Sequence, residues 1–328
     1  MKTQVLATAT PEELETAVTL AVDHLQRGEI VALPTETVYG LAADALNIDA
    51  ALKIFEAKER PRFDPLIVHL PDHRWLDRLT SISSEDDKLA RSLIANFWPG
   101  PLTLVLRRRE VVPDVVTAGL ETVAVRMSAH PVFSAIVRRF ERPLAAPSAN
   151  RFGRISPTTA QHVVMELEGR VGLVVDAGAT THGVESTIVA VRNGRIEILR
   201  HGPITVEQLR EFAEVQSVTA SARVEAPGQL RSHYAPRTPL VLTRNICEYE
   251  IAPGARAGAL SFGPHEGSGF AEIRTLSSSR DLREAATNLF RYLRELDDLG
   301  LGVIVAEELP EEGLGTAIMD RLRRAAAR

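Results

Sequence analysis

The chain has 328 residues, enough for two domains of ordinary size, and a normal globular composition of 45% hydrophobic and 25% charged residues. Its net charge of −5 and its pI near 6.0 argue against a protein that holds nucleic acid by bulk charge. The single cysteine, Cys247, excludes an internal disulfide and a thiolate metal cluster, and we expect it to be a small buried residue. Residues 1–10 lack the apolar core of a signal peptide, and no apolar run is long enough to cross a bilayer, so we expect a cytoplasmic protein without a membrane partner.

Hydrophobic periodicity predicts alternating helices and strands over the first 212 residues. Thr10 to Glu13 has the pattern of a capping box, and apolar residues then recur at helical spacing until Gly28. Asn193-Gly194 is the strongest short signal for a hairpin. The predicted helices are 11–27, 49–59, 84–97, 131–140, 159–167 and one after Thr205, and the predicted strands are 30–33, 66–70, 102–106, 123–126, 144–146, 173–176, 187–192 and 195–199.

The periodicity fades between residues 213 and 237, and we expect a linker there. A smaller α/β pattern follows, without a cluster of catalytic residue types; its predicted strands are 239–243, 257–262 and 301–306, and its predicted helices are 281–299 and 316–327. The expected organisation is therefore a first domain over 1–212, a linker over 213–237 and a small domain over 238–328.

Polar groups stand just beyond the predicted strand Ile30–Leu33, which ends at Pro34. Two threonines, a glutamate and a tyrosine follow before Gly40. Open α/β sheets bind ligands just past the ends of their strands. This stretch is therefore a candidate binding loop.

Two further stretches add donors suited to phosphate. Lys58 and Arg60 lie at the end of a predicted helix, where Pro61 favours an extended Arg60, and Ser148 and Asn150 follow a predicted strand. Together they suggest a site for an anionic, phosphate-bearing ligand. Alternatively, the two cations complement the helix dipole, and the serine and asparagine form a turn that satisfies its own backbone.

Other candidates each have a second interpretation. His69 ends an apolar strand and either reaches a ligand or is structural, and Gly183–Thr187 is either a second binding loop or a glycine turn that opens the hairpin. Arg126 and Arg200 end predicted strands, where an arginine suits a carboxylate. No Walker loop, Gly-x-Gly-x-x-Gly or His-Glu-x-x-His motif occurs, and Ser148 lies in no nucleophile elbow.

Seven short motifs occur in one order: Pro-Thr-Glu-Thr-Val-Tyr-Gly at 34–40, Lys-x-Arg-Pro at 58–61, Pro-Leu-Ile-Val-His at 65–69, Trp-Pro-Gly-Pro-Leu-Thr at 98–103, Thr-Val-Ala-Val-Arg at 122–126, Ala-Pro-Ser-Ala-Asn at 146–150 and Gly-Val-Glu-Ser-Thr at 183–187. In this order they resemble the threonylcarbamoyl-AMP synthase family. The resemblance implies an α/β fold: a YrdC-like twisted, mixed, open sheet flanked by helices, followed by a smaller Rossmann-like α/β domain.

The resemblance also implies an activity. ATP, L-threonine and bicarbonate would give threonylcarbamoyl-AMP, pyrophosphate and water, with Mg²⁺ on the phosphates. The product would pass to downstream proteins that modify an adenosine of tRNA, and we expect no direct binding of tRNA by this chain. No covalent nucleophile is implied, and Lys58 and Arg60 would act as electrostatic stabilisers.

Residue roles follow from the same resemblance. The residues implied for L-threonine are Thr35, which lies in the same loop without a specific role, Thr37, His69, Arg126, Ala146 and Ser186. The residues implied for ATP are Lys58, Arg60, Asp64, Thr122, Ser148, Asn150, Ser156, Arg200, His233 and Tyr234.

Two departures from the family pattern bear on these roles. The family usually has asparagine where this chain has Asp64, which either acts through Mg²⁺ or a water or has left the nucleotide's surroundings. Residues 227–236 resemble the linker of the longer members, but Gln229-Leu230-Arg231 differs from their usual residues. We expect His233 and Tyr234 to close over bound ligand.

Three other functions compete with this interpretation. The first is a nucleotide- or RNA-binding module without catalysis, against which the negative charge counts. The second is a carbamoyl transferase for metal-centre maturation, which the single cysteine disfavours because such chains carry zinc-finger cysteines. The third is a serine hydrolase, for which no nucleophile motif is present.

Overall fold

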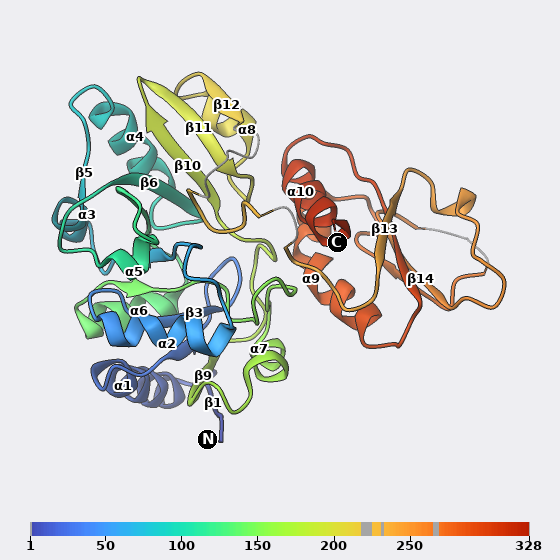
Figure 1. Cartoon of the computed structure of the whole chain (residues 1–328), viewed down its shortest axis with the longest axis horizontal. Coiled ribbons are helices and arrows are strands. Elements are labelled where there is room, and N and C mark those ends of the chain that lie inside the picture. Colours follow the sequence, from blue (N-terminus) through green and yellow to red (C-terminus); the bar gives the residue numbers. More distant parts are fainter. Residues whose placement is uncertain (1, 218–224, 231–232, 265–268, 328) are drawn as a thin grey trace.

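The structure is a computed structural model and describes residues 2–217, 225–230, 233–264 and 269–327 (Figure 1). Its helices are α1 (Pro11–Gln26), α2 (Ile48–Lys58), α3 (Arg74–Leu79), α4 (Asp87–Phe97), α5 (Asp114–Thr117), α6 (Pro131–Phe140), α7 (Ala160–Leu167), α8 (Val206–Arg210), α9 (Leu282–Asp297), α10 (Leu314–Ala326) and the 3₁₀ turn η1 (Ile246–Glu248). Its strands are β1 (Gln4–Ala7), β2 (Val31–Leu33), β3 (Gly40–Asp44), β4 (Ile67–His69), β5 (Thr80–Ser81), β6 (Leu102–Arg108), β7 (Thr122–Arg126), β8 (Leu144–Ala145), β9 (Leu173–Asp176), β10 (Thr187–Arg192), β11 (Arg195–Arg200), β12 (Val215–Ser217), β13 (Leu240–Thr243), β14 (Ala257–Ser261), β15 (Glu272–Thr275) and β16 (Val303–Glu307).

The first sheet runs in the order β1-β9-β2-β3-β8-β4-β7-β6-β10-β11-β12, with β5 beside β6. It is mixed: β4 runs parallel to β7, for example, while β6 and β7 are antiparallel. The expected mixed, open α/β sheet is therefore confirmed. We call the part of the chain from β1 to β12 the large unit.

One strand beside the candidate binding loop was missed. β3 begins at Gly40, where we expected only the end of a loop, and it pairs antiparallel with β2. Its sequence, Gly-Leu-Ala-Ala-Asp, lacks the β-branched residues that signal a strand. Pairing between two neighbouring strands decides its structure, and the binding loop is thereby clamped at both ends.

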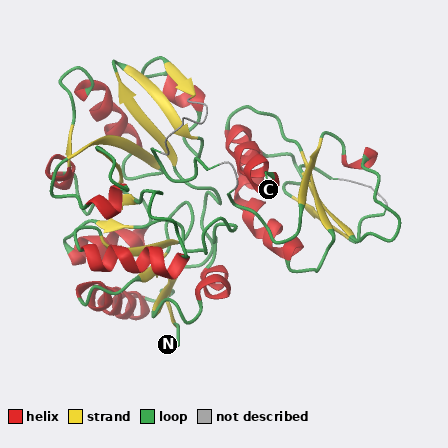
Figure 2. Ribbon diagram, in the orientation of Figure 1, coloured by secondary structure: helices red, strands yellow, loops and turns green. Residues whose placement is uncertain are grey.

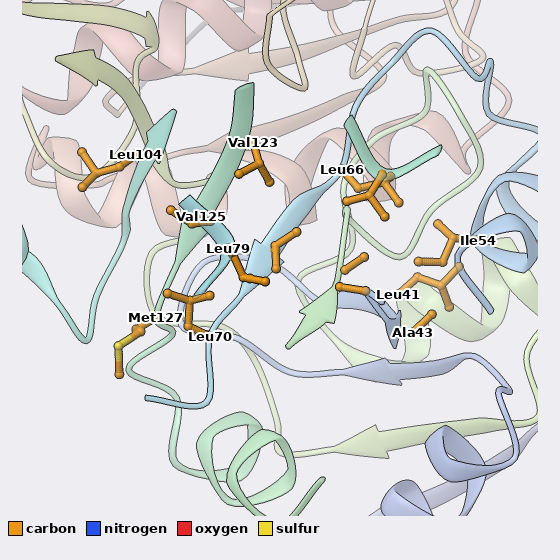
Figure 3. Packing of buried hydrophobic residues seen from close by; sticks show 14 of the residues in the cluster. Leu41, Ala43, Ile54, Leu66, Leu70, Leu79, Leu104, Val123, Val125 and Met127 are labelled. Atoms are coloured by element: carbon orange, nitrogen blue, oxygen red, sulfur yellow. The ribbon is translucent and has the colours of Figure 1, made fainter. Parts of the chain in front are cut away.

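Helices cover both faces of the large sheet. The apolar face of α1 packs with α6, β2 and β9 in one core cluster, which includes Val18, Val22 and Phe133. A second cluster, which includes Leu41 and Ile54, joins α2 to other strands of the sheet (Figure 3). Leu52 is only half-buried, whereas Ala50 and Ala51 of the same helix are buried.

The second sheet, in the order β13-β16-β14-β15, is entirely parallel. It forms the small unit with α9 and α10, which lie between this sheet and the large unit (Figures 1 and 2). This is the expected small α/β domain. Cys247 is exposed in η1, so the expectation of a buried cysteine was wrong: within this short turn, Ile246 is the residue that turns inward.

The predicted linker begins inside the large sheet, because β12 pairs with β11 up to Ser217. Residues 218–224 and two residues of the expected ligand-closing segment, Arg231 and Ser232, lie outside the described residues. None of the helices in the described ranges is long and apolar enough to span a membrane.

Gly183 lies tightly against α9 of the small unit. It has φ +71°, and an added Cβ would lie 2.3 Å from the backbone oxygen of Ala286 in α9. Gly178 has a similar φ of +80° but nothing within 4 Å of an added Cβ. We therefore expect Gly183→Ala to lower the free energy of unfolding by about 1–3 kcal/mol more than Gly178→Ala, as measured by urea denaturation. Both variants carry the same left-handed strain, so equal losses would mean that this close contact contributes nothing to stability.

Candidate active site

The ends of several strands meet at one edge of the large sheet. His69 is the last residue of β4 and Arg126 the last residue of β7, and the parallel register places them side by side. Ala146 follows β8 and donates its N–H to the Ile67 oxygen, at 2.9 Å. Arg200 ends β11. Side chains from four separate strands are thereby brought together.

A pocket opens at this edge of the sheet. The sequence-predicted residues that line it are Thr35, Thr37, Arg60, His69, Arg126, Ala146, Ser148, Ser186, Arg200, His233 and Tyr234. Members of both predicted sets, for threonine and for ATP, thus share one pocket.

Three protein groups fix the guanidinium of Arg126. Its Nη2 lies 2.6 Å from Glu36 Oε1, its Nη1 donates to Thr37 Oγ1 at 3.1 Å, and its Nε donates to the Gly100 oxygen at 3.2 Å. Burial raises the pKa of Glu36, but Arg126 and a hydrogen bond from Ser128 outweigh this and lower that pKa to about 2. Glu36 is therefore an anion at every working pH and fixes the orientation of the guanidinium.

The Thr-Glu-Thr loop owes its shape to Thr35. Its Oγ1 donates to the Val38 oxygen at 2.6 Å and lies 2.9 Å from Thr37 Oγ1. Such local bonds between side chain and backbone define a turn. Thr35 therefore shapes the loop in which Thr37 faces Arg126.

His69 is an uncharged imidazole. Burial, followed by the nearby charge of Arg126, lowers its pKa to about 3. Its ring lies 4.7 Å from that of Phe133, and its Nδ1 has no hydrogen-bond partner among the described residues. The residue thus offers a neutral nitrogen beside Arg126.

Lys58 does not line the pocket. Its side chain is fully buried, and its Nζ donates to the backbone oxygens of Ser148, at 2.5 Å, and of Asn150. Burial lowers the pKa of this ammonium well below its usual value. Lys58 lies in the last turn of α2, as the helix-dipole alternative has it, and it holds the Ser148–Asn150 loop against that end of the helix.

Arg60 reaches the pocket, while Asp64 stands behind it. Asp64 is completely buried, and its Oδ2 lies 2.9 Å from Arg60 Nη2. Burial raises the pKa of this carboxyl, although Arg60 and Lys58 oppose the shift. Asp64 therefore offsets part of the charge that Arg60 presents to a ligand.

Three other predicted ATP residues also lie off the pocket. Asn150 donates to the backbone oxygens of Arg151 and Arg154, so it forms the turn of the alternative interpretation. Ser156 donates to Glu185. Thr122 begins β7, at the end opposite Arg126, and lines a separate surface hollow. The structure thus does not bring Thr122 to the pocket, since residues four apart on a strand are separated by about 13 Å.

Sequence reasoning missed two carboxylates and one arginine. Glu36 and Glu185 lie inside motifs that drew attention for their hydroxyl groups, and Glu185 lines the pocket. Arg321 in α10 forms an ion pair with Glu185, with 2.9 Å between Nε and Oε2. Glu36 and Glu185 could have been found, because each is an acidic residue inside a predicted binding loop. Arg321 could not, because it lies 136 positions beyond Glu185 and belongs to no motif.

Family models cover most of the chain. A model described as "Telomere recombination" (Sua5/YciO/YrdC) matches residues 23–202, and one described as "Threonylcarbamoyl-AMP synthase, C-terminal domain" matches residues 204–327. A threonylcarbamoyl-AMP synthase of Pyrococcus abyssi is 39% identical, with 95% of this chain and 94% of the relative covered. One of Bacillus subtilis is 40% identical over 99% and 98%. The chain belongs to the threonylcarbamoyl-AMP synthase family.

A solved structure extends the likeness to both units of this family member. The crystal structure of P. abyssi Sua5 complexed with L-threonine matches with a TM-score of 0.88 and 35% identity, and the match covers 99% of this chain and 98% of the other. The arrangement of the two units is therefore part of the shared fold.

Proposed function

We propose that this chain is an L-threonylcarbamoyladenylate synthase that serves threonylcarbamoyladenosine modification of tRNA. The observation that carries the proposal is the single pocket in which Arg60, Arg126 and Arg200 converge from separate elements. Three fixed guanidinium groups suit a ligand pair with a carboxylate and a triphosphate. The full-length likeness to threonylcarbamoyl-AMP synthases, and to a relative that binds L-threonine, supports the same reaction.

The chemistry needs positioning rather than an enzyme nucleophile. Bicarbonate takes up a proton and loses water to give carbon dioxide. The neutral amine of threonine attacks its carbon: an N–C bond forms, the electron pair of one C=O π bond moves to that oxygen, and one proton leaves the nitrogen. An oxygen of the resulting carbamate then attacks the α-phosphorus of ATP; an O–P bond forms and pyrophosphate leaves with the electron pair of the broken bond. Both the carbamate and the product anhydride are labile in water, so a pocket walled by buried side chains favours the reaction.

The pocket divides the work between two sides. We propose that Arg126, aimed by Glu36 and Thr37, holds the threonine carboxylate. The neutral His69 lies at its side and avoids adding a cation near the reacting amine. Ser186 is fixed by Thr103 and by Arg200 Nη2 rather than by a histidine, which supports a binding role over a hydrolase nucleophile.

We propose that Arg60, Arg200 and Ser148 hold the ATP chain, with His233 and Tyr234 covering it. Lys58 and Asn150 act indirectly, because they shape the loop that presents Ser148. The large unit then carries the chemistry of both substrates.

The pocket does not fit a magnesium ion held by the protein itself. Within the described ranges no group of three or more metal-ligating side chains is present, and the carboxylates nearest to hand, Glu185 and Asp64, are paired with arginines. We propose that Mg²⁺ enters as part of the Mg-ATP substrate, and we assign no step to a residue-bound ion. Asp64 then has an electrostatic role through Arg60 only.

Replacing Asp64 by asparagine tests this role. Because Asp64 offsets the charge of Arg60, we expect Asp64→Asn to lower the KM for ATP roughly three- to tenfold and to leave the Mg²⁺ dependence of the rate unchanged. Steady-state kinetics at several Mg²⁺ concentrations measures both. Asp72→Asn, which removes an exposed carboxylate paired with Arg74, is the control. A shifted Mg²⁺ optimum would instead give Asp64 the metal role.

One assay separates the synthase from its competitors. The proposal requires pyrophosphate release from ATP that depends on both L-threonine and bicarbonate, with threonylcarbamoyl-AMP detected by mass spectrometry. A binding module would bind ATP without releasing pyrophosphate, a carbamoyl transferase would not depend on threonine, and a hydrolase would need neither co-substrate. We further propose that the product passes to separate transfer proteins in the cytoplasm, and that this acidic chain does not itself hold tRNA.

A further inference from the structure

Arg321 extends from the small unit to the wall of the pocket. Its side chain is completely buried although it belongs to α10. Its Nε bonds Glu185 Oε2 at 2.9 Å, its Nη2 donates to the His201 oxygen at 2.9 Å, and its guanidinium lies 5.1 Å from the centre of the Tyr234 ring. These partners come from the large unit and from the segment that joins the units.

Glu185, the carboxylate that pairs with Arg321, lines the pocket. It is the only acidic side chain among the described residues that line the pocket. Ser156 donates to its Oε1, and Arg321 occupies its Oε2. Burial raises the pKa of Glu185, but Arg321 and then Arg200 lower it, so the carboxylate is an anion. An uncompensated anion here would repel a triphosphate in the same pocket.

We propose that Arg321 is a positioning residue for the nucleotide: by pairing with Glu185 it cancels a negative charge in the pocket wall and holds Glu185 and Tyr234 in place. The proposal rests on the proposed function, which brings a triphosphate into this pocket. It also gives the small unit a role, because its last helix supplies the cation that bonds Glu185 directly.

Simple attachment of one unit to the other does not require Arg321. Arg294 of α9 binds Glu166 of α7, with 2.9 Å between Nη1 and Oε1, and Thr287 donates to the Thr181 oxygen at 3.0 Å. Arg294 is also buried, at 7% exposure, but it does not line the pocket, and its hydrogen bonds go to Glu166 and to the Ile155 oxygen, neither of which lines the pocket. It is therefore a matched control: a buried arginine of the small unit, paired with a glutamate of the large unit, away from the nucleotide.

The test compares Arg321→Met with Arg294→Met in the full-length chain. Isothermal titration calorimetry gives the Kd for a non-hydrolysable ATP analogue with Mg²⁺, steady-state kinetics gives the KM for ATP and for threonine, and thermal unfolding gives stability. We expect Arg321→Met to raise the Kd and KM for ATP about tenfold or more, with a smaller change in the KM for threonine. Arg294→Met should lower stability without changing either ATP constant.

The double variant Arg321→Met with Glu185→Gln provides the decisive rescue. Since both charges are then absent, ATP affinity should return to within about threefold of the starting value. Unchanged ATP constants in Arg321→Met, equal loss in Arg294→Met, or a double variant no better than the single one would each overturn the proposal. If Arg321→Met does not fold, Glu185→Gln alone decides, because it must bind the analogue at least as tightly as the parent chain. A parent chain that binds no ATP at all would refute the proposed function, and this inference with it; a parent that binds ATP while Arg321→Met is unaffected refutes the inference alone.

Discussion

Arg126→Lys is expected to reduce kcat/KM for threonine roughly 10–100-fold, because charge-assisted hydrogen bonds of this kind each contribute about 1.5–3 kcal/mol. Lysine keeps one positive charge beside the buried Glu36 but loses the planar fork that binds a carboxylate with two bonds. The Kd for an ATP analogue should change less than about twofold, since ATP is assigned to other arginines. Initial rates at varied threonine concentrations, with calorimetry for ATP, measure both quantities.

The choice of lysine matters for the outcome. Arg126→Met would leave Glu36 as an uncompensated buried anion and would destabilise the fold by about 3–5 kcal/mol, which would confuse a binding defect with unfolding. Arg139→Lys is the control, because Arg139 pairs with Glu15 at the exposed surface. If Arg126→Lys weakened ATP binding as much as it weakened threonine use, the division of the pocket into two sides would be wrong.

Acid is expected to destabilise the protein well before its carboxylates are protonated. The pKa values of His69 and His233 are lowered to about 3, in both cases first by burial, from a usual value of 6.5. Between pH 6.5 and pH 3 these two histidines are therefore protonated in the unfolded chain but remain neutral in the folded chain. Their stabilisation is therefore complete above pH 6.5 and is lost progressively as the pH falls toward 3. Between about pH 7.5 and about pH 5.0, each histidine should remove on the order of 2 kcal/mol of unfolding free energy.

Substitution isolates the share of one histidine. Urea denaturation at about pH 7.5 and about pH 5.0 gives the loss of unfolding free energy on acidification. This loss should be smaller in His69→Gln than in the parent chain by on the order of 2 kcal/mol. His73→Gln, which replaces an exposed histidine, is the control substitution. An equal drop in the parent and in His69→Gln would mean that His69 binds its proton in the folded chain as readily as in the unfolded one.

The local elements follow closely from the sequence. The capping box at Thr10 and Glu13 forms as predicted, and the hairpin at Asn193-Gly194 joins β10 to β11. Periodicity and cap chemistry act within one or two turns of the chain, so they can be seen without the fold. β3 was missed because its small residues have little intrinsic preference for a strand. Its pairing with β2 and β8 decides its structure instead.

Of the predicted site residues, those at strand ends line the pocket, while several with partners far along the chain do not. His69, Arg126 and Arg200 end their strands and do line the pocket. Lys58 carries an ammonium group that could bind a phosphate, yet it donates to two backbone oxygens of a loop about ninety positions away. Arg60 lines the pocket and Lys58 does not. This difference depends on packing between distant segments, which a local sequence pattern does not indicate.

The sequence by itself determined the alternation of helices and strands, the family and the residue types that gather beyond the strand ends, because each is written in spacing or in short motifs. Only the tertiary structure decided that His69 lies beside Arg126, that Glu36 fixes this arginine, and that Arg321 reaches Glu185 from the last helix. The physical reason is that strand register and the burial of opposite charges are set by contacts between segments far apart in the chain. The contacts of Arg126 exist only once the large sheet has formed, and the contact of Arg321 exists only once the small unit has packed against the large one.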